Sequence, residues 1–556
     1  MWYTQSILMI GGNQEMLGRR SPQCGFFDAQ SVPHRVPVNS FYGRMGAASA
    51  ELFHDDDLAD MYCPDNGRPS LPPSLMCGIT LLQFYDDVSD REAVERLLFD
   101  MRWKVALNLP LDFAGIDPSS LVVFRRRLLE HGQERYAFDR LIEVGRAAGF
   151  IPDRVTLLID TTPVKGAGAV QDTYTLLRKG TRKLLRAAGY HLPGKRQALA
   201  SQAQALVATY LDRDHKAEID WSDPQQRAAQ LRVLVQDAEA ALELVADQVD
   251  NDEVRTMGWL LTKILGDDLD SDESGIPRLA HGTAPGRIIS SSDREMRHGR
   301  KSAAKRFDGF KVSVATETDT ELILDIADMP ATGGDGRQLI PTLARVEEHT
   351  DVAVERVIGD GAYNSGDNLA ACATYAGHAI DVVTRFRQVK DDQTDKTAFA
   401  IDLAAHTVAC PQGHTVTGQG GHDRAGRAIL KFAFPRPVCA SCALFADCVC
   451  SKTTGRTVKT HAHEYYLQQA RARQAEDDFK ALYATRCTVE RKIAELVRHG
   501  LRATRYRGGS KRLLQRLWIG AAVNLKRLFV LAHDQRRDLR AVLARRTQPI
   551  PANLAA

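Results

Sequence analysis

Residues 155–160 read Val155-Thr156-Leu157-Leu158-Ile159-Asp160, and residues 354–360 read Val354-Glu355-Arg356-Val357-Ile358-Gly359-Asp360. Each run is short, rich in β-branched and apolar residues and closed by an acid, which predicts two buried strands that end in carboxylates. Thr161-Thr162-Pro163 predicts a turn directly after the first strand. Runs at 310–315 and 322–326 predict a β-hairpin, 335–348 and 367–376 predict helices, and 380–383 predicts another strand. This order of elements predicts an α/β core.

The rest of the chain divides around that core. Residues 1–50 lack clear periodicity and predict a flexible N-terminal arm. Residues 51–150 predict a helical, DNA-binding domain, with a capping box at Ser89-Asp90-Arg91-Glu92 and a helix start at Asp117-Pro118. The core is expected at 151–165 and 300–390, with a helical insertion at 166–299. Residues 391–460 predict a cysteine-rich β insertion, and 461–545 predict helices again.

Composition and charge narrow the class of protein. The 556 residues are 44% hydrophobic and 26% charged, which is typical of a globular chain with two to four folding units. No apolar run suits a membrane helix and the start lacks a secretory leader, so a cytoplasmic protein without membrane contact is expected. Residues 451–556 hold 23 Lys and Arg against 8 Asp and Glu; this net +15 leaves −12 for the rest of a +3 chain. The excess predicts a polyanionic partner, although a solvated basic helix face has the same composition.

Three acids suggest a metal site. If the strands before Asp160 and Asp360 are neighbours, about 4.8 Å apart, their carboxylates converge, and carboxylates are the ligands that Mg²⁺ prefers. Glu490 borders the apolar face of a predicted helix, formed by Val489, Ile493 and residues 496–497, so it is a candidate third ligand. Each acid alone also fits a plainer role, as a turn residue for either Asp or a surface ion-pair partner for Glu490.

Five blocks of sequence resemble the successive motifs of insertion-sequence DDE transposases, and the insertion sequence 1182 family above all. They are Asp160-Thr161-Thr162-Pro163-Val164-Lys165-Gly166, Asp293-Arg294-Glu295-Met296-Arg297-His298-Gly299-Arg300-Lys301, Phe307-Asp308-Gly309-Phe310-Lys311, Gly359-Asp360-Gly361-Ala362-Tyr363 and Thr488-Val489-Glu490-Arg491. The resemblance covers about residues 40–530. It implies an RNase H-like core in which the three acids hold two Mg²⁺ (or Mn²⁺) ions. It also implies a homodimer on DNA in a bacterial cytoplasm, associated with the nucleoid when bound.

Related transposases surround the glutamate with a Tyr-x2-Arg-x3-Glu-x6-Lys motif. Tyr483 and Arg486 fall in register with it and are therefore expected to contact DNA near the cut end. The lysine position holds Val497 here, and the nearest base is Arg498.

Cysteines cluster between the second aspartate and the glutamate. Cys439-Ala440-Ser441-Cys442, with Cys410 before it and Cys448 after it, supplies four ligands for a structural Zn²⁺; His414 and Cys450 are substitutes for one of them. Reduced, buried thiols fit the same spacing. The resemblance favours zinc, because similar transposases carry a cysteine-rich β insertion at this place.

Basic residues follow the glutamate in a dense tract. We expect this tract to neutralise DNA phosphates, with Tyr506 available for stacking; its basic members are Arg498, Arg502, Arg505, Arg507, Lys511, Arg512 and Arg516. Arg125-Arg126-Arg127, on a predicted helix, is a candidate recognition element for the terminal inverted repeat, and equally fits a solvated face.

The function expected from these observations is transposition: binding of terminal inverted repeats, cleavage of the element ends and joining of the 3′-OH to target DNA. Two alternatives remain. One is an inactive or repurposed transposase that regulates DNA, and the other is a metal-dependent nuclease that never joins strands.

Overall fold

The computed structural model describes residues 17–19, 35–63, 69–212, 218–248, 250–302, 304–386 and 394–543. Most of the expected N-terminal arm lies outside these ranges. Its last part is helical, because α1 (Phe41–Leu52) begins at the N-cap Ser40, whose Oγ accepts a hydrogen bond from the Gly43 N–H at 3.1 Å. Met45 and Leu52 are buried in the main core. A flexible arm is therefore wrong for residues 41–50.

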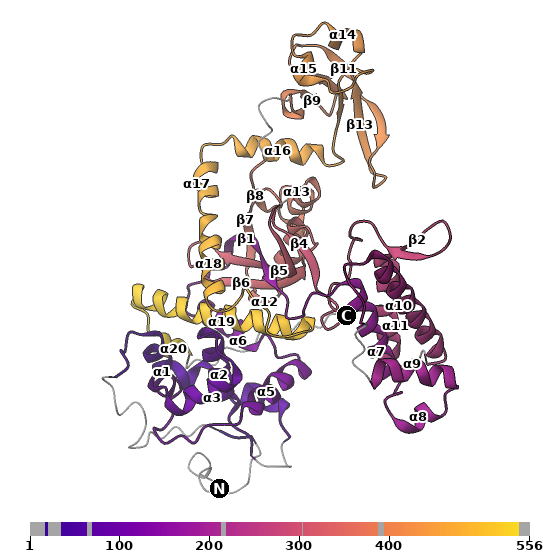
Figure 1. Cartoon of the computed structure of the whole chain (residues 1–556). Helices are drawn as coiled ribbons and strands as arrows, with labels where there is room; N and C mark the ends of the chain where they lie inside the picture. Colours follow the sequence, from indigo (N-terminus) through magenta and orange to yellow (C-terminus); the bar gives the residue numbers. More distant parts are fainter. Residues whose placement is uncertain are drawn as a thin grey trace.

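A mixed sheet forms the centre of the molecule (Figure 1). β1 pairs antiparallel with β5 and parallel with β7, β7 pairs parallel with β8, and the outer edge of β5 pairs with β4 and then β6. The strands are β1 (Arg154–Lys165), β4 (Arg297–Arg300), β5 (Arg306–Glu317), β6 (Ile323–Pro330), β7 (Ala353–Ile358) and β8 (Asp381–Val383). The hairpin and the strands expected at 354 and 380 are confirmed, and the order β6-β5-β1-β7-β8 is compatible with an RNase H-like fold.

The turn expected after Asp160 is wrong. β1 continues for five residues beyond it, and Pro163 pairs with Lys311 of β5. The parallel partner β7 stops at Ile358, opposite Leu158. Beyond that point one side of β1 lacks a β7 partner, which is where a strand tolerates a proline without an N–H group.

Helices from both ends of the chain pack together against the sheet. The N-terminal set is η2 (Asp56–Met61), α2 (Pro73–Tyr85), α3 (Asp90–Phe99), α4 (Met101–Leu107), α5 (Pro118–Glu130) and α6 (Tyr136–Ala147). The C-terminal set is α16 (Glu464–Gln474), α17 (Phe479–Ala484), α18 (Cys487–Arg498), α19 (Gly509–Asp534) and α20 (Leu539–Leu543). α19 contacts α2, α6 and β6, so that one continuous core joins the N-terminal helices, the sheet and the C-terminal helices.

Within the core region, η3 (Asp335–Gln338) and α12 (Leu339–Thr350) precede β7, and α13 (Gly366–Ala373) and η4 (Tyr375–Gly377) precede β8. Asp351 ends α12 in the left-handed region, with φ of 50°. These elements correspond to the two helices expected at 335–348 and 367–376.

Between β1 and β4 the chain forms a helical unit with its own hydrophobic cluster. Its elements are α7 (Thr173–Ala187), α8 (Pro193–Gln197), α9 (Ser201–Leu211), α10 (Pro224–Leu244), α11 (Asp252–Asp268), β2 (Leu269–Ser271) and β3 (Pro277–Leu279). In Figure 1 this unit stands to one side of the sheet.

Between β8 and α16 the chain forms small sheets around a third cluster that contains Phe432 and Phe434. Its elements are η5 (Lys396–Ala398), β9 (Ala400–Asp402), β10 (Thr407–Ala409), β11 (Thr415–Thr417), β12 (Gln419–His422), β13 (Ala428–Ala433), α14 (Arg436–Ala440), α15 (Phe445–Cys448) and β14 (Thr457–Lys459). Across the described ranges, no helix has the length and apolarity needed to cross a membrane.

Candidate active site

Asp160 and Asp360 lie side by side at the centre of the sheet. Leu158 of β1 is paired with Ile358, the last residue of the parallel strand β7; Asp160 lies two residues further along β1, and Asp360 lies two residues beyond the end of β7. The Asp160 carboxylate accepts the Thr161 N–H at 2.8 Å, and the Asp360 carboxylate accepts the Ala362 N–H at 2.8 Å. Both side chains are half-buried. The register therefore brings Asp160 and Asp360 to neighbouring positions, with Asp160 inside β1 and Asp360 in the connection that follows β7.

Gly359 allows this close approach. A Cβ atom at this position would stand 2.7 Å from Cδ2 of Tyr363 and 3.2 Å from Cγ2 of Ile159. The first distance is well inside van der Waals contact, so a larger residue would push β7 away from β1 or displace the Tyr363 ring. Tyr363 is fully buried, and its hydroxyl is close enough to Asp160 and Asp360 for their charges to help raise its pKa, which burial raises most.

Glu490 reaches the same place from the first turn of α18, which packs on β1 and β5. Arg486, the residue before α18, connects the helix to the sheet. Its guanidinium lies 3.5 Å from the Asp160 carboxylate and donates a hydrogen bond to the Glu490 carboxylate. The Glu490 side chain is 52% exposed and the Asp160 side chain 19% exposed, so the acids line an accessible surface.

The three acids influence one another electrostatically. The pKa of Asp160 is raised to about 6, mainly by burial and also by the charges of Asp360 and Glu490, although the Thr161 hydrogen bond and the charge of Arg486 act to lower it. Burial lowers the pKa of Arg486, but the carboxylates of Glu490, Asp160 and Asp360 outweigh it and raise that pKa overall. The site therefore carries more negative charge than its one arginine neutralises.

Across the described part of the chain, no three or more His, Cys, Asp or Glu side chains are arranged to hold a metal ion. At the acid site, Asp160 and Glu490 are each paired with the guanidinium of Arg486.

Tyr483 and Arg486 both lie at this site. The Arg486 guanidinium is 6.0 Å from the centroid of the Tyr483 ring, and Phe479 stacks on that ring at 5.8 Å. Sequence reasoning missed two neighbours. Arg385 lies 4.8 Å over the Tyr483 ring, and Tyr363 is buried within electrostatic reach of Asp160 and Asp360. A signal existed for both, since Tyr363 closes the Gly359–Tyr363 block and Arg385 follows the end of β8.

The basic tract divides into exposed and internally paired residues. Arg498, Arg507 and Lys511 are exposed, as DNA contacts require. Arg512 is buried, bonded to Asp328 at 2.8 Å and to Glu295 at 2.5 Å, so its expected role as a phosphate contact is not supported.

Arg516 is fully buried on the same salt-bridged cluster, 3.1 Å from Asp328. The ring of Tyr506 is covered by the Arg125 guanidinium at 5.5 Å, and is therefore not available for stacking on a base in this arrangement.

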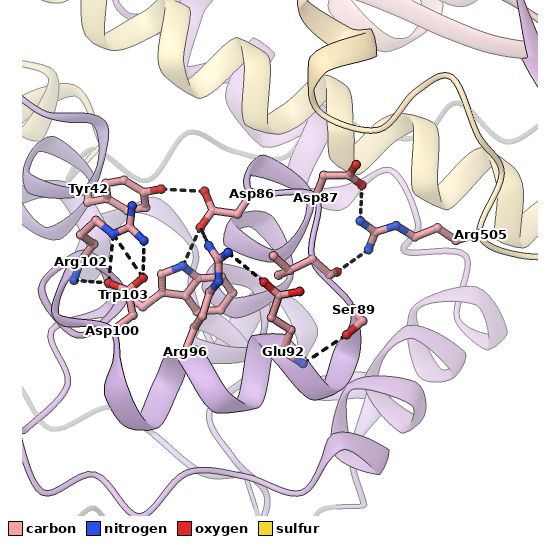
Figure 2. A network of polar contacts seen from close by, with 11 residues as sticks. Tyr42, Asp86, Asp87, Ser89, Glu92, Arg96, Asp100, Arg102, Trp103 and Arg505 are labelled. Carbon is pink, nitrogen blue, oxygen red and sulfur yellow. Dashed lines mark hydrogen bonds and ion pairs between the residues drawn. The ribbon is translucent and has the colours of Figure 1, made fainter.

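Arg505 joins the basic tract to the N-terminal helices (Figure 2). It donates to the Val88 carbonyl at 2.6 Å and pairs with Asp87. Beside it, Asp86 accepts hydrogen bonds from Tyr42, Arg96 and Trp103 at 2.6, 2.6 and 2.8 Å. This network connects the segment before α19 to the N-terminal helices. The guanidinium of Arg505 is neutralised within it by Asp87.

The arginine triplet on α5 has internal partners too. Arg125 is buried and pairs with Asp90 at 2.6 Å; Arg127 lies 4.5 Å over the Tyr62 ring. Arg126 is exposed, 3.6 Å from Glu130. A recognition helix that presents all three arginines is therefore not what the structure contains.

The four predicted zinc ligands line one small cavity of about 30 Å³. Cys410, Cys439, Cys442 and Cys448 surround it together with His414 and aromatic residues, whereas Cys450 is exposed outside it. The Leu444 N–H donates to the Cys442 sulfur at 3.4 Å and the Arg456 N–H to the Cys439 sulfur at 3.5 Å. The structure thus places the four cysteines around one cavity, although within the described residues no three potential ligands are close enough together to hold a metal ion as they stand.

Comparison with known families gives two matches. The model of a transposase DDE domain matches residues 409–529, and that of a transposase domain (DUF772) matches residues 30–127. The first range contains the cysteines and Glu490; the second contains most of the N-terminal helices. No curated protein and no solved structure matches the chain. Together with the neighbouring acids of β1, β7 and α18, the two matches support a DDE transposase, a class of enzyme that acts on DNA and generally uses divalent metal ions.

Proposed function

We propose that this chain is a DNA transposase that binds the terminal inverted repeats of its element, cleaves the ends and joins each 3′-OH to target DNA. The observation that carries the proposal is the placement of Asp160 in β1 and of Asp360 just after the neighbouring parallel strand β7, with Arg486 contacting both Asp160 and Glu490. The finer relation, to the insertion sequence 1182 family, is part of the proposal.

The three carboxylates suit Mg²⁺ or Mn²⁺ by donor chemistry, because hard oxygen ligands without sulfur or imidazole favour these ions. Asp160, Asp360 and Glu490 would hold two such ions, and the chemistry these would supply is activation of the attacking oxygen and stabilisation of the leaving one. Asp160 and Asp360 are held by backbone N–H groups and provide the fixed side of the site. Glu490 is on a helix surface, and it is released for this task when Arg486 turns towards DNA.

DNA binding is assigned to the exposed cations near this site. Arg498, Arg507 and Lys511 are proposed phosphate contacts, and Tyr483 with Arg486 is proposed to hold the cut end. Arg505 and Arg512 act instead as positioning residues, because each has a carboxylate partner within the protein.

The expected domain divisions are retained as proposals, with the helical region at 51–150 as a DNA-binding part and 166–299 and 391–460 as insertions in the core. We also propose that the protein acts as a homodimer on DNA, in a bacterial cytoplasm and at the nucleoid. Pairing of two element ends is the reason to expect two copies.

We further propose that the cysteine cavity holds a structural Zn²⁺. The proposal rests on the cavity lining, because Cys410, Cys439, Cys442 and Cys448 surround one small space and four cysteines are a donor set that structural Zn²⁺ takes in proteins. Metal analysis of protein purified without chelator tests this. Cys442→Ser should lower the zinc content and the melting temperature, whereas Cys450→Ser, just outside the cavity, should change neither.

One experiment separates the proposal from its alternatives. The purified chain is given a pre-cleaved duplex carrying the element's terminal repeat, a target duplex and Mg²⁺. Joined product supports transposition. Cleavage of the intact repeat without joining identifies a nuclease, and binding without either reaction identifies a regulator.

A further inference from the structure

Helix α7, in the helical unit between β1 and β4, carries an unusual charge distribution. Five of its 15 residues are Lys or Arg and none is Asp or Glu. The neighbouring α10 is mixed, with Arg227 and Arg232 against Asp237, Glu239 and Glu243. The five cations therefore do not reflect the composition of the unit as a whole.

The cations of α7 occupy one face. Leu176, Leu177, Gly180, Thr181, Leu184 and Leu185 are buried in the unit's own core. The basic residues lie between these positions in the sequence, so the helical repeat places them on the opposite face. They are Arg178, Lys179, Arg182, Lys183 and Arg186. Lys179 and Arg186 are exposed.

This face adjoins the connection between the helical unit and the sheet. The two linking segments run together, with the Gln171 N–H bonded to the Ile289 carbonyl at 2.9 Å and the Ser291 N–H bonded to the Gln171 side chain at 3.0 Å. Lys183 donates a hydrogen bond to the Ser291 carbonyl, which places α7 against the segment that leads into Arg294. That segment is anchored on its other side by the ion pair between Glu295 and Arg512 of α19.

The basic residues of the two parts consequently approach one another. Burial lowers the pKa of Lys183, and the like charges of Arg294, Arg507 and Lys179 lower it further. Cations gathered this way repel each other in the free protein, and a polyanion relieves the repulsion.

We infer that the basic face of α7, with Arg294 and Arg507, is a second DNA-binding surface that grips the phosphate backbone of duplex DNA continuing from the acid site. The assignment rests on the proposed function insofar as DNA is the partner. The surface recognises charge without sequence, because Lys and Arg contacts to phosphates carry no base information.

The test measures DNA binding by the full-length chain across a salt series, with one duplex containing the terminal repeat and one of unrelated sequence. Lys179→Glu with Arg186→Glu should weaken binding to both duplexes by roughly tenfold or more and reduce the log–log salt slope by about 0.9 per lost contact. The matched control is Arg227→Glu with Arg232→Glu on α10, which makes the same change in charge and should leave affinity and slope unchanged. Lys179→Gln with Arg186→Gln removes the two positive charges without adding negative ones. This variant replaces the first in the binding assay if the first has a lowered melting temperature.

The outcomes distinguish this inference from the proposed function. If the wild-type chain binds neither duplex, the proposed function fails. If it binds, but the α7 variants retain its affinity and salt slope, the inference alone is overturned. It is also overturned if the α10 control weakens binding equally, or if the loss is confined to the repeat sequence.

Discussion

Two ionic clusters of this molecule contain three acids each, but they differ in how those acids are neutralised. At the candidate active site, Asp160, Asp360 and Glu490 share one guanidinium, that of Arg486, and the cluster opens to solvent. At the start of α19, the acids Asp293, Glu295 and Asp328 surround two buried arginines, Arg512 and Arg516.

The second cluster is closed by many contacts. Arg512 also stacks over the Phe310 ring at 3.8 Å, and Arg516 donates to the Thr504 hydroxyl at 2.8 Å. Such a cluster holds α19 to the sheet, because both arginines pair with Asp328 of β6. The number of acids therefore does not separate the two clusters. An exposed cluster with more carboxylates than cations indicates a functional site, whereas a cluster built around buried arginines indicates a structural role.

The largest expected effect is on the open cluster. Asp360→Asn keeps the shape of the side chain but removes a ligand charge, and should slow DNA cleavage by roughly a thousandfold or more, about 4 kcal/mol of barrier. The melting temperature should stay the same or rise, because a repelling charge is lost. Asp351→Asn, exposed at the end of α12, is the control for cleavage. Cleavage at the wild-type rate by Asp360→Asn would show that this carboxylate is a turn residue only.

The closed cluster should respond in stability instead. Arg516→Met leaves Asp328 without one of its buried partners and should cost about 3–5 kcal/mol of unfolding free energy. Arg507→Met, exposed in the same tract, should cost less than about 0.5 kcal/mol. Urea denaturation measures both. Equal losses for the two variants would remove the distinction between the clusters.

A smaller, pH-dependent effect is expected at Glu495 of α18, which is bonded to Lys526 at 2.7 Å and to Lys492 at 2.9 Å. Burial acts to raise the pKa of Glu495, but the two lysines outweigh it and lower that pKa from 4.5 to about 2. The stabilisation, up to about 3 kcal/mol, is therefore present above pH 4.5 and is lost as the pH falls towards 2. Glu495→Gln should be less stable than wild type at neutral pH, and the difference should shrink on acidification.

The smallest effect sets the lower end of the scale. Arg126 and Glu130 on α5 form a pair 3.6 Å apart, with side chains that are 64% and 59% exposed. A double-mutant cycle with alanine at both positions should give a coupling of less than about 0.5 kcal/mol. A coupling energy above about 1 kcal/mol would contradict this prediction, because it would show that an exposed ion pair can stabilise this protein as much as a buried one.

The order of strands and the adjacency of Asp160 and Asp360 could be predicted from local patterns, because each strand is a short apolar run and its side chains repeat every two residues. The length of β1 could not. Pro163 indicates a turn locally, and only the absence of a β7 partner beyond Leu158 explains why the strand continues.

The local sequence also could not predict which arginines of the basic tract are buried and which are exposed. Arg512 and Arg507 are close in a tract of similar composition, yet one is buried and the other exposed. What separates them is Asp328, 184 residues earlier in the chain, whose position depends on the packing of α19 against β6. The α7 face was missed for a different reason, since its meaning depends on Arg294 and Arg507 being brought near it.

The position of α18 and α19 near the end of the chain has a consequence for synthesis. The two aspartates emerge from the ribosome long before Glu490, and α19, which packs against α2, α6 and β6, emerges later still. A nascent or truncated chain that ends before residue 509 has Asp160, Asp360 and Glu490 but lacks the helix that joins the N-terminal helices to the sheet. Synthesis of α19 is thus a precondition for a stable arrangement of the three acids, and we expect chains that stop before α19 not to assemble the candidate active site.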